Sequence, residues 1–273
     1  MVPSLRKYFS MSRQSGRLFV CMFIAVVLSI SVFSGGTARS VFAARPYAGA
    51  ANGNTVLILG TSVNGGINSV EAIQATALGY TVEIASADQW AAKTQAEFAT
   101  YRALILGDNR CSAISSIQAA INNRSTWSPV IRGNVMLIGG DPGFHAAASG
   151  QTGISATTEI RQSIGFAAAD VGKTGLYAAF GCAYASAPES GTTVDFLDQF
   201  GVFKIRGKSW DNVHKVADHQ ALTGLTDTTL SNWGQSTHAG FIQYPSSFVP
   251  VAIMKDLTGN GNVSFSDGTN GVP

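Results

Sequence analysis

The sequence is poor in charged residues, and this limits the partners it can have. Only 12% of its 273 residues are Asp, Glu, Lys or Arg, against about a quarter in typical soluble domains. Five of the 18 basic residues lie in residues 1–43, which contain no acid, so the rest of the chain carries 13 basic and 16 acidic side chains. Without a basic surface to neutralise a phosphate backbone, we expect no nucleic-acid partner. Sparse charge is also more typical of a secreted protein than of a cytosolic one.

The sequence also lacks the short motifs of several common sites. The glycine-rich segment 60–66, GTSVNGG, matches neither GxGxxG nor GxxxxGK, so we predict no nucleotide site there. The histidines show neither HxH nor HxxxH spacing. A metal site built on histidines therefore has no motif of its own in this chain.

Residues 1–43 have the pattern of a signal peptide. A basic segment precedes the apolar run 18–33, and small residues lead to Val41-Phe42-Ala43, with cleavage expected after Ala43 or Ala44. We therefore expect a protein exported from a bacterial-type cell to the cell envelope or the medium, with residues 44–54 as a flexible leader. The alternative is an uncleaved membrane anchor. The run of about 16 residues is short of the roughly 20 that a spanning helix needs, and we expect no other membrane contact.

The stretch 134–145, NVMLIGGDPGFH, organises the rest of the chain. Its apolar run 135–138 ends in glycines, as a buried parallel strand does at its carboxyl end. Three other apolar runs end in the same way, at 55–60, 103–108 and 175–182. Since parallel strands leave a sheet along one edge, we expect these glycine-rich exits to converge and to form the binding edge.

Helical and strand patterns alternate around these runs. We predict another strand at 81–84, and helices at 67–78, 88–101, 112–121 and 157–166. The fold class is therefore α/β, a three-layer sandwich with a mainly parallel, flavodoxin-like central sheet over residues 55–255. After residue 185 the pattern is weaker. There we expect short helices at 194–200 and 221–225, and strands at 202–205, 239–243 and 249–254.

Three segments resemble class I glutamine amidotransferase-like domains of secreted, uncharacterised bacterial proteins. VMLIGGDPG (135–143) resembles the strand and turn on the oxyanion side, FGCAY (180–184) the nucleophile turn, and HQALTGL (219–225) a later His-containing segment. The resemblance implies a hydrolase or amidase with Cys182 as nucleophile, His219 or His238 as base, and Gly140 and Gly143 amides as oxyanion donors. The implied edge loop is Gly139, Gly140, Asp141, Gly143 and His145.

The sequence departs from that family at important positions. Phe180 and Tyr184 are large where a nucleophile elbow needs small residues, and Gln243-Tyr244-Pro245 stands where the family has His-Pro-Glu. The triad is therefore incomplete. We favour a non-catalytic module that binds a small molecule, a glycan or a protein, with the hydrolase as the alternative.

Removal of the signal peptide, and Cys21 with it, leaves two cysteines. We predict that Cys111 and Cys182 form a structural disulfide, while the alternative keeps Cys182 as a thiol nucleophile. The remaining chain has four histidines, His145, His214, His219 and His238. We expect His145 and His238 to face the same edge of the sheet. With Asp108 or Asp141 they could form a metal or acid/base site. The competing interpretation is a hydrogen-bonded structural role.

Residues 256–273 allow two interpretations. The spacing of a calcium loop is matched by Asp256, Thr258, Asn260, Gly261, Val263 and Asp267. The flanking segments, however, do not have the pattern of the helices that an EF-hand needs. Asn260-Gly261 is also a hairpin turn signal. We therefore expect a glycine-rich hairpin or loop in a truncated chain, and no cofactor, with calcium as the alternative.

Overall fold

The computed structural model describes residues 53–108, 111 and 113–273. The predicted signal peptide, most of the predicted leader and Ser112 lie outside these residues. The described part is a mixed α/β fold with one parallel sheet and two smaller antiparallel sheets. Within it, no helix has both the length and the apolar character needed to traverse a lipid bilayer.

The central sheet has five strands, and all its strand pairs are parallel. Its strands are β1 (Thr55–Leu59), β2 (Thr81–Ala85), β3 (Ala103–Leu106), β4 (Ile131–Ile138) and β5 (Thr174–Ala179). The predicted parallel arrangement of the apolar runs is confirmed. The order across the sheet is β2-β1-β3-β5-β4, whereas the flavodoxin-like order is 2-1-3-4-5. The last two strands are therefore exchanged, and β5 lies between β3 and β4.

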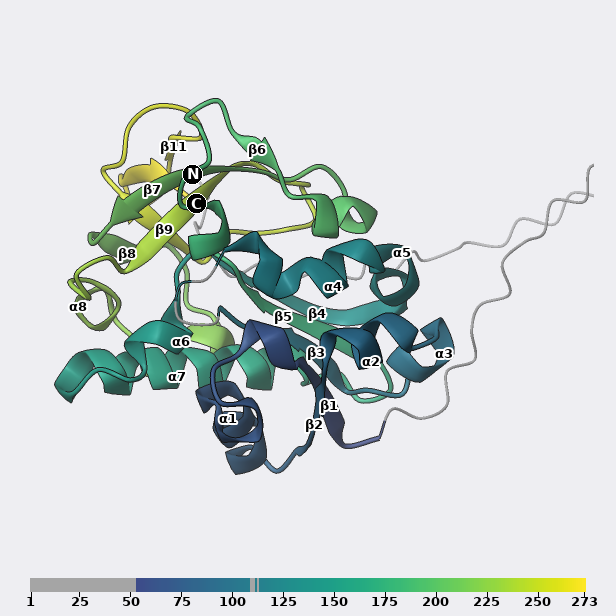
Figure 1. Ribbon diagram of the computed structural model, residues 1–273. Coiled ribbons are helices and arrows are strands. Elements are labelled where there is room, and N and C mark those ends of the chain that lie inside the picture. Colours follow the sequence, from purple (N-terminus) through teal and green to yellow (C-terminus); the bar gives the residue numbers. More distant parts are fainter. Residues whose placement is uncertain (1–52, 109–110, 112) are drawn as a thin grey trace, which may run out of the picture. The chain divides into compact units, whose positions relative to one another are not determined.

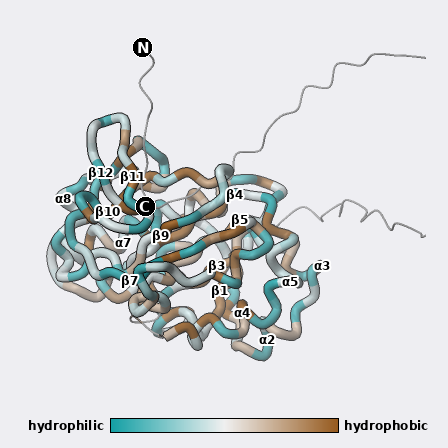
Figure 2. The backbone as a smooth tube through the Cα atoms, turned by 90° about the horizontal axis from the view of Figure 1, so that it is seen from above, coloured by the Kyte–Doolittle hydropathy of each residue, from teal (hydrophilic) through white to brown (hydrophobic). Residues whose placement is uncertain are grey.

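Both faces of this sheet are buried, which explains its continuous apolar runs. Leu57, Leu104 and Leu137 belong to the cluster on one face, together with Trp90 and Trp127. The alternate residues Ile58, Ile105 and Ile138 belong to the cluster on the other face. Helices lie on both sides of the sheet (Figure 1). Figure 2 shows the most hydrophobic segments, in brown, running through the central strands.

Most of the helices are short. They are α1 (Val70–Ala77), α2 (Ala87–Ala92), α3 (Gln95–Phe98), α4 (Gln118–Asn122), α5 (Arg124–Trp127), α6 (Pro142–His145), α7 (Gly150–Ala167) and α8 (Asp227–Leu230). The 3-10 helices η1 (Gly60–Ser62) and η2 (Gly66–Asn68) precede α1, η3 (Ile114–Ile117) precedes α4, and η4 (Ser128–Val130) follows α5. Ser69 starts α1 by accepting the N–H of Ala72, as N-cap residues do.

Several predicted helices differ from the observed ones. The predicted helix 88–101 is wrong as one unit, because Thr94 and Glu97 form a second capping box inside it and start α3. The predicted helix 67–78 is split into η2 and α1, and 112–121 into η3 and α4. The predicted helix 157–166 is confirmed but begins earlier, after Ser149.

The C-terminal part of the chain forms the two antiparallel sheets. The first has the order β6-β7-β9 and the second β11-β12-β10-β8. Their strands are β6 (Thr192–Thr193), β7 (Lys204–Trp210), β8 (Val213–Lys215), β9 (Thr237–Gln243), β10 (Ala252–Lys255), β11 (Val263–Ser264) and β12 (Asn270–Val272). The predicted helices at 194–200 and 221–225 are the 3-10 helices η6 (Asp195–Phe200) and η7 (Gln220–Leu222). The predicted strands at 202–205 and 249–254 are shifted toward the C-terminus, to β7 and β10.

The residues 263–272 form the predicted hairpin, but not with the predicted turn. Strands β11 and β12 pair antiparallel, and the N–H of Phe265 donates to the carbonyl of Thr269 at 2.7 Å. The turn therefore lies at 265–269. Asn260-Gly261 lies before β11, in a loop that Arg206 holds by donating to the carbonyl of Thr258.

Candidate functional site

The exits of β3, β5 and β4 meet at the carboxyl edge of the central sheet. Because β5 lies between the other two, the turn after it contacts both neighbouring exits. The N–H of Cys182 donates to Asp108 Oδ2 at 3.1 Å, and the N–H of Gly181 donates to the carbonyl of Gly140 at 3.3 Å. The predicted convergence of these glycine-rich turns is confirmed.

A disulfide joins Cys111 to Cys182 across this edge, as predicted. The two cysteines follow adjacent parallel strands, whose spacing of about 4.8 Å suits a disulfide. Cys182 begins the 3-10 helix η5 (Cys182–Tyr184). The positive φ angles of the described non-glycine residues occur at Cys111, Asn232 and Asp256. Cys182 therefore lacks both the strained turn of a nucleophile elbow and, in this form, a thiol.

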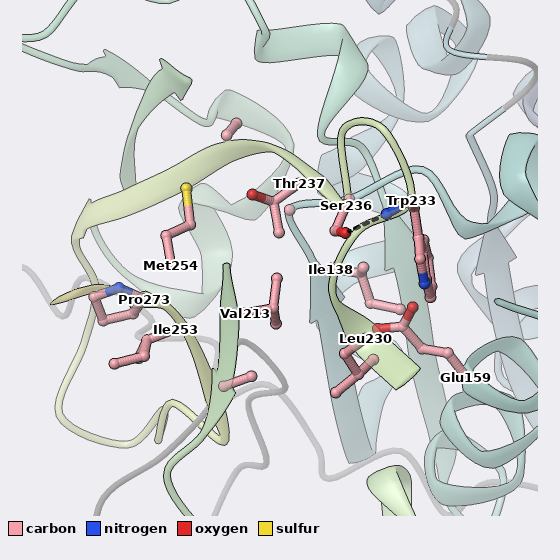
Figure 3. A pocket seen from close by; sticks show the side chains of 14 residues that line it. Ile138, Glu159, Val213, Leu230, Trp233, Ser236, Thr237, Ile253, Met254 and Pro273 are labelled. Carbon is pink, nitrogen blue, oxygen red and sulfur yellow. Dashed lines mark hydrogen bonds between the residues drawn. The ribbon is translucent and has the colours of Figure 1, made fainter. Parts of the chain in front are cut away.

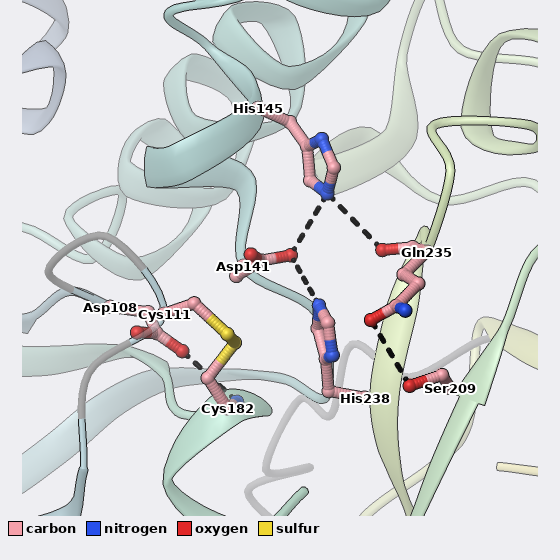
Figure 4. The surroundings of a disulfide bond; sticks show 8 residues. All are labelled: Asp108, Cys111, Asp141, His145, Cys182, Ser209, Gln235 and His238. Carbon is pink, nitrogen blue, oxygen red and sulfur yellow. Dashed lines mark hydrogen bonds and ion pairs between the residues drawn. A yellow bond between two sulfur atoms is a disulfide. The ribbon is translucent and has the colours of Figure 1, made fainter.

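Asp141 binds two imidazoles with one carboxylate oxygen (Figure 4). Its Oδ1 lies 3.0 Å from His238 Nε2 and 3.2 Å from His145 Nε2. His145 Nε2 is also 3.1 Å from the carbonyl oxygen of Gln235. Because a carbonyl only accepts hydrogen bonds, the proton of His145 is on Nε2. All three ionisable side chains are buried.

The surroundings of Asp141 favour the ionised form of its carboxyl group. Burial alone would raise the pKa of Asp141, but hydrogen bonds from His145 and His238 lower it. Burial likewise opposes the charged form of His145, whereas Asp141 raises the pKa of that imidazole. The cluster therefore favours a carboxylate paired with a histidine that holds its proton.

Backbone geometry explains how these residues meet. Asp141 is the N-cap residue of α6, and His145 lies four residues later in the same short helix. His238 comes from β9, where its N–H and that of Ala239 both donate to the carbonyl of Gly139, at 2.9 and 3.1 Å. A Cβ on Gly139 would lie 2.2 Å from the carbonyl oxygen of Ala239. Glycine is therefore needed here for the close approach of β9.

Sequence reasoning missed two buried acids near Tyr177. Glu71 of α1 and Glu159 of α7 are 2% and 8% exposed. Burial raises the pKa of each to about 7; nearby Asp108 adds to the effect on Glu71, and Asp141 adds to that on Glu159. The Tyr177 hydroxyl is buried without a hydrogen-bond partner among the described residues. A sequence signal for these acids was present, because each lies on the same helix face as the buried residues around it.

Glu159 borders a small cavity of about 30 Å³ (Figure 3). Ile138, Leu230 and Trp233 also line it. This volume is enough for a water molecule. The surroundings are otherwise mostly apolar, which is why burial has such a large effect on the carboxyl group.

An open groove lies beside Glu71 at the exits of β1 and β3. We call it the edge groove; it has a volume of about 320 Å³, and its polar lining is Asn64, Asn68, Glu71, Gln74, Asp108 and Thr157. Glu71 Oε1 occupies the space that a Cβ on Gly107 or Gly143 would need, at 2.8 and 2.9 Å. An adjoining hollow of about 440 Å³ continues along α7 to Arg161 and shares Gln74, Ala146 and Thr157 with the groove.

The other predicted site residues lie apart from this edge or in other roles. His219 Nδ1 accepts the N–H of Ala221, and its ring packs against Phe166. His214 contacts Asp227 and Asp267. Gly140 lies against the carbonyl of Ser236, and Gly143 lies against Glu71.

The four candidate calcium ligands each contact a different partner. Asp256 accepts from Asn212, and Asn260 donates to Glu189. The carbonyl of Thr258 accepts from Arg206. Burial opposes ionisation of Asp267, but hydrogen bonds from Thr269 and His214 together outweigh it and lower the pKa of Asp267 to about 2. These contacts join the tail to neighbouring segments of the chain.

Removal of the disulfide will lower the stability of the protein. The bridge joins residues 71 positions apart, and closing a loop of this size restricts the unfolded chain. We expect the double variant Cys111→Ala/Cys182→Ala to lose about 2–4 kcal/mol of unfolding free energy in urea. Wild type treated with a reductant should show the same loss. Equal stability of the bridged and bridge-free proteins would contradict this expectation.

Replacement of Glu159 will change the pH dependence of stability. The pKa of Glu159 is about 7 in the folded protein, above its ordinary value of 4.5, so the unfolded state gives up this proton first as pH rises. The contribution of Glu159 to the free energy of unfolding is therefore fully present below pH 4.5 and is lost between pH 4.5 and 7. We expect Glu159→Gln to remove a decline of about 2.5 kcal/mol between pH 5 and pH 8.

The measurement for Glu159 is urea unfolding of the wild type and the variant at both pH values. The matched control is Asp218→Asn, because the Asp218 side chain is fully exposed at 108%. A Glu159→Gln protein that keeps the wild-type slope would show that the Glu159 carboxyl is not responsible for the decline.

The chain was compared with family models, curated proteins and solved structures. None of these comparisons finds a match.

Proposed function

We propose that this protein is a binding module that takes a small, neutral, polyhydroxylated ligand, a saccharide, in the edge groove. We further infer an amidotransferase-like three-layer domain, flavodoxin-like except for the exchange of its last two strands, that has no thiol chemistry in its disulfide-bonded form. The observation that carries the proposal is the position of the groove. It opens between the exits of β1 and β3, and β1 pairs with β2 on its other side. This is the switch point at which open α/β sheets bind ligands.

The lining of the edge groove suits hydroxyl groups. The amides of Asn64, Asn68 and Gln74 provide donors and acceptors, and Glu71 and Asp108 provide carboxyl oxygens. Two acids disfavour a phosphate or another anion. With a pKa of about 7, Glu71 is protonated below neutrality and then both donates and accepts.

Apolar side chains border the same region. Ile73 lines the groove and is 51% exposed, and Ile154 lines the adjoining hollow and is 62% exposed. Phe144, 50% exposed, lies on α6 next to the lining residue Gly143. Exposed apolar groups beside a polar hollow are typical of ligand sites, and they can cover the C–H faces of a sugar ring.

Export through residues 1–43 is part of this proposal. The disulfide between the two cysteines that remain after signal removal supports it, because such bridges persist in oxidising compartments. The expected ligand is therefore extracellular or in the cell envelope.

Binding can be tested with a panel of neutral oligosaccharides by titration calorimetry. We expect at least one member to bind, and Glu71→Gln and Gln74→Ala to weaken that binding about 10-fold or more, as loss of a buried hydrogen bond does. The control is Asp170→Asn, whose side chain is exposed and pairs with Lys173. Absence of binding across the panel, or equal binding by all variants, would refute the proposal.

The alternative function is a cysteine-dependent amidase that acts after reduction. One observation favours it: a ring nitrogen of His238 lies within 4.8 Å of the Cys182 sulfur, and Asp141 holds that ring. This is the order of nucleophile, base and orienting acid found in many hydrolases.

Ammonia release from L-glutamine distinguishes the two functions. The variant Cys111→Ser frees the Cys182 thiol, and Cys111→Ser/Cys182→Ser is its matched control. Our proposal predicts the same background release from both. Release that occurs with the single variant and is lost in the double variant would favour the amidase.

A further inference from the structure

Two sulfurs, an imidazole and a carboxylate meet at the carboxyl edge. One ligating atom from each of Cys111, Asp141, Cys182 and His238 lies within 4.8 Å of the other three (Figure 4). The four residues come from four segments of the chain, after β3, β4 and β5 and at the start of β9. Thiolate, imidazole and carboxylate together are a donor set for zinc.

We propose that the reduced protein binds one Zn²⁺ ion through Cys111, Cys182, His238 and Asp141. In the disulfide-bonded form the sulfurs are bonded to each other, and a disulfide is not a zinc ligand in the way that a thiolate is. The bridge and the metal ion are therefore alternative occupants of the same position. The oxidation state of the two cysteines decides which of them is present.

The chemistry of the exchange balances with a phosphine as reductant. The phosphine breaks the S–S bond and is oxidised to the phosphine oxide; water supplies its oxygen atom and the two hydrogens that the sulfurs gain. Zn²⁺ then displaces both thiol protons to solvent and forms two Zn–S bonds. The neutral imidazole of His238 and the carboxylate of Asp141 complete four ligands.

The distances allow this change without a rearrangement of the fold. Bond lengths of about 2.0–2.3 Å in tetrahedral zinc sites place neighbouring ligand atoms roughly 3.3–3.8 Å apart. The four atoms start within 4.8 Å of one another, so the non-sulfur atoms move by about 1 Å. The two sulfurs separate from bonding distance.

Surrounding contacts already orient two of the four ligands. His145 donates to Asp141 Oδ1, and so fixes the carboxylate of Asp141. Asp108 accepts the N–H of Cys182. Outer contacts of this kind strengthen metal sites. Cys111 is exposed, which gives a reductant and a metal ion access from solvent.

The test uses the purified protein in its disulfide-bonded and phosphine-reduced forms, titrated with Co²⁺ and then with Zn²⁺. We expect the reduced form to bind one Co²⁺ per chain, with the thiolate charge-transfer band and the visible bands of tetrahedral cobalt. Zn²⁺ should displace the Co²⁺, and excess Mg²⁺ should not. The disulfide-bonded form should show none of these bands.

Variants identify the non-sulfur ligands. We expect His238→Ala and Asp141→Asn to weaken Co²⁺ binding at least roughly tenfold, and His219→Asn, on another part of the chain, to bind as the wild type does. Equal binding by both redox forms, a cobalt spectrum without the thiolate band, or full affinity in His238→Ala would overturn the proposal.

Near-ultraviolet circular dichroism completes the test. Reduced wild type should keep its native spectrum, or regain it when Zn²⁺ is added. A spectrum that is lost on reduction and not restored by Zn²⁺ would also overturn the proposal, because the four residues would then have no common site. The wild-type comparison does not depend on any variant folding.

Discussion

The carbonyl oxygen of Gly139 is the contact on which the candidate site depends. It accepts two backbone N–H groups from β9, those of His238 and Ala239, and so joins the exit of a parallel strand to a strand of another sheet. Only a residue without a Cβ permits that approach. Because β9 is held there, His238 reaches Asp141 and the sulfur pair. Two segments almost 100 residues apart in sequence thus form one cluster.

The sequence predicts the strands well and their order poorly. The apolar runs identify the parallel strands because both sheet faces are buried, and two remaining cysteines identify the disulfide. No local pattern shows that β5 pairs with both β3 and β4, since neighbours in a sheet are chosen by tertiary packing. That order is what places Cys182 beside Asp108 and Cys111. The helix break at Thr94 was readable, because its capping box is local.

For the candidate site too, the sequence predicts some of the residues and misses others. The position of His145 after one strand and of His238 at the start of another led us to expect both at one edge, and both contact Asp141 there. Glu71 and Glu159 were missed because an acid on an apolar helix stripe looks like an exception to the pattern. The calcium spacing of 256–267 fixes sequence positions but not the direction of each side chain. In the structure Asp256 contacts Asn212, and Asp267 contacts His214.

The insertion of β5 between β3 and β4 also has a consequence for biosynthesis. Strand β4 is at the edge of the central sheet, and the strand it pairs with, β5, begins only at Thr174. During translation the apolar residues of β4 leave the ribosome before this neighbour exists. Unpaired apolar strands promote aggregation, and α7, which is made in between and packs against β4 in the folded protein, is the first helix after β4 that can cover it.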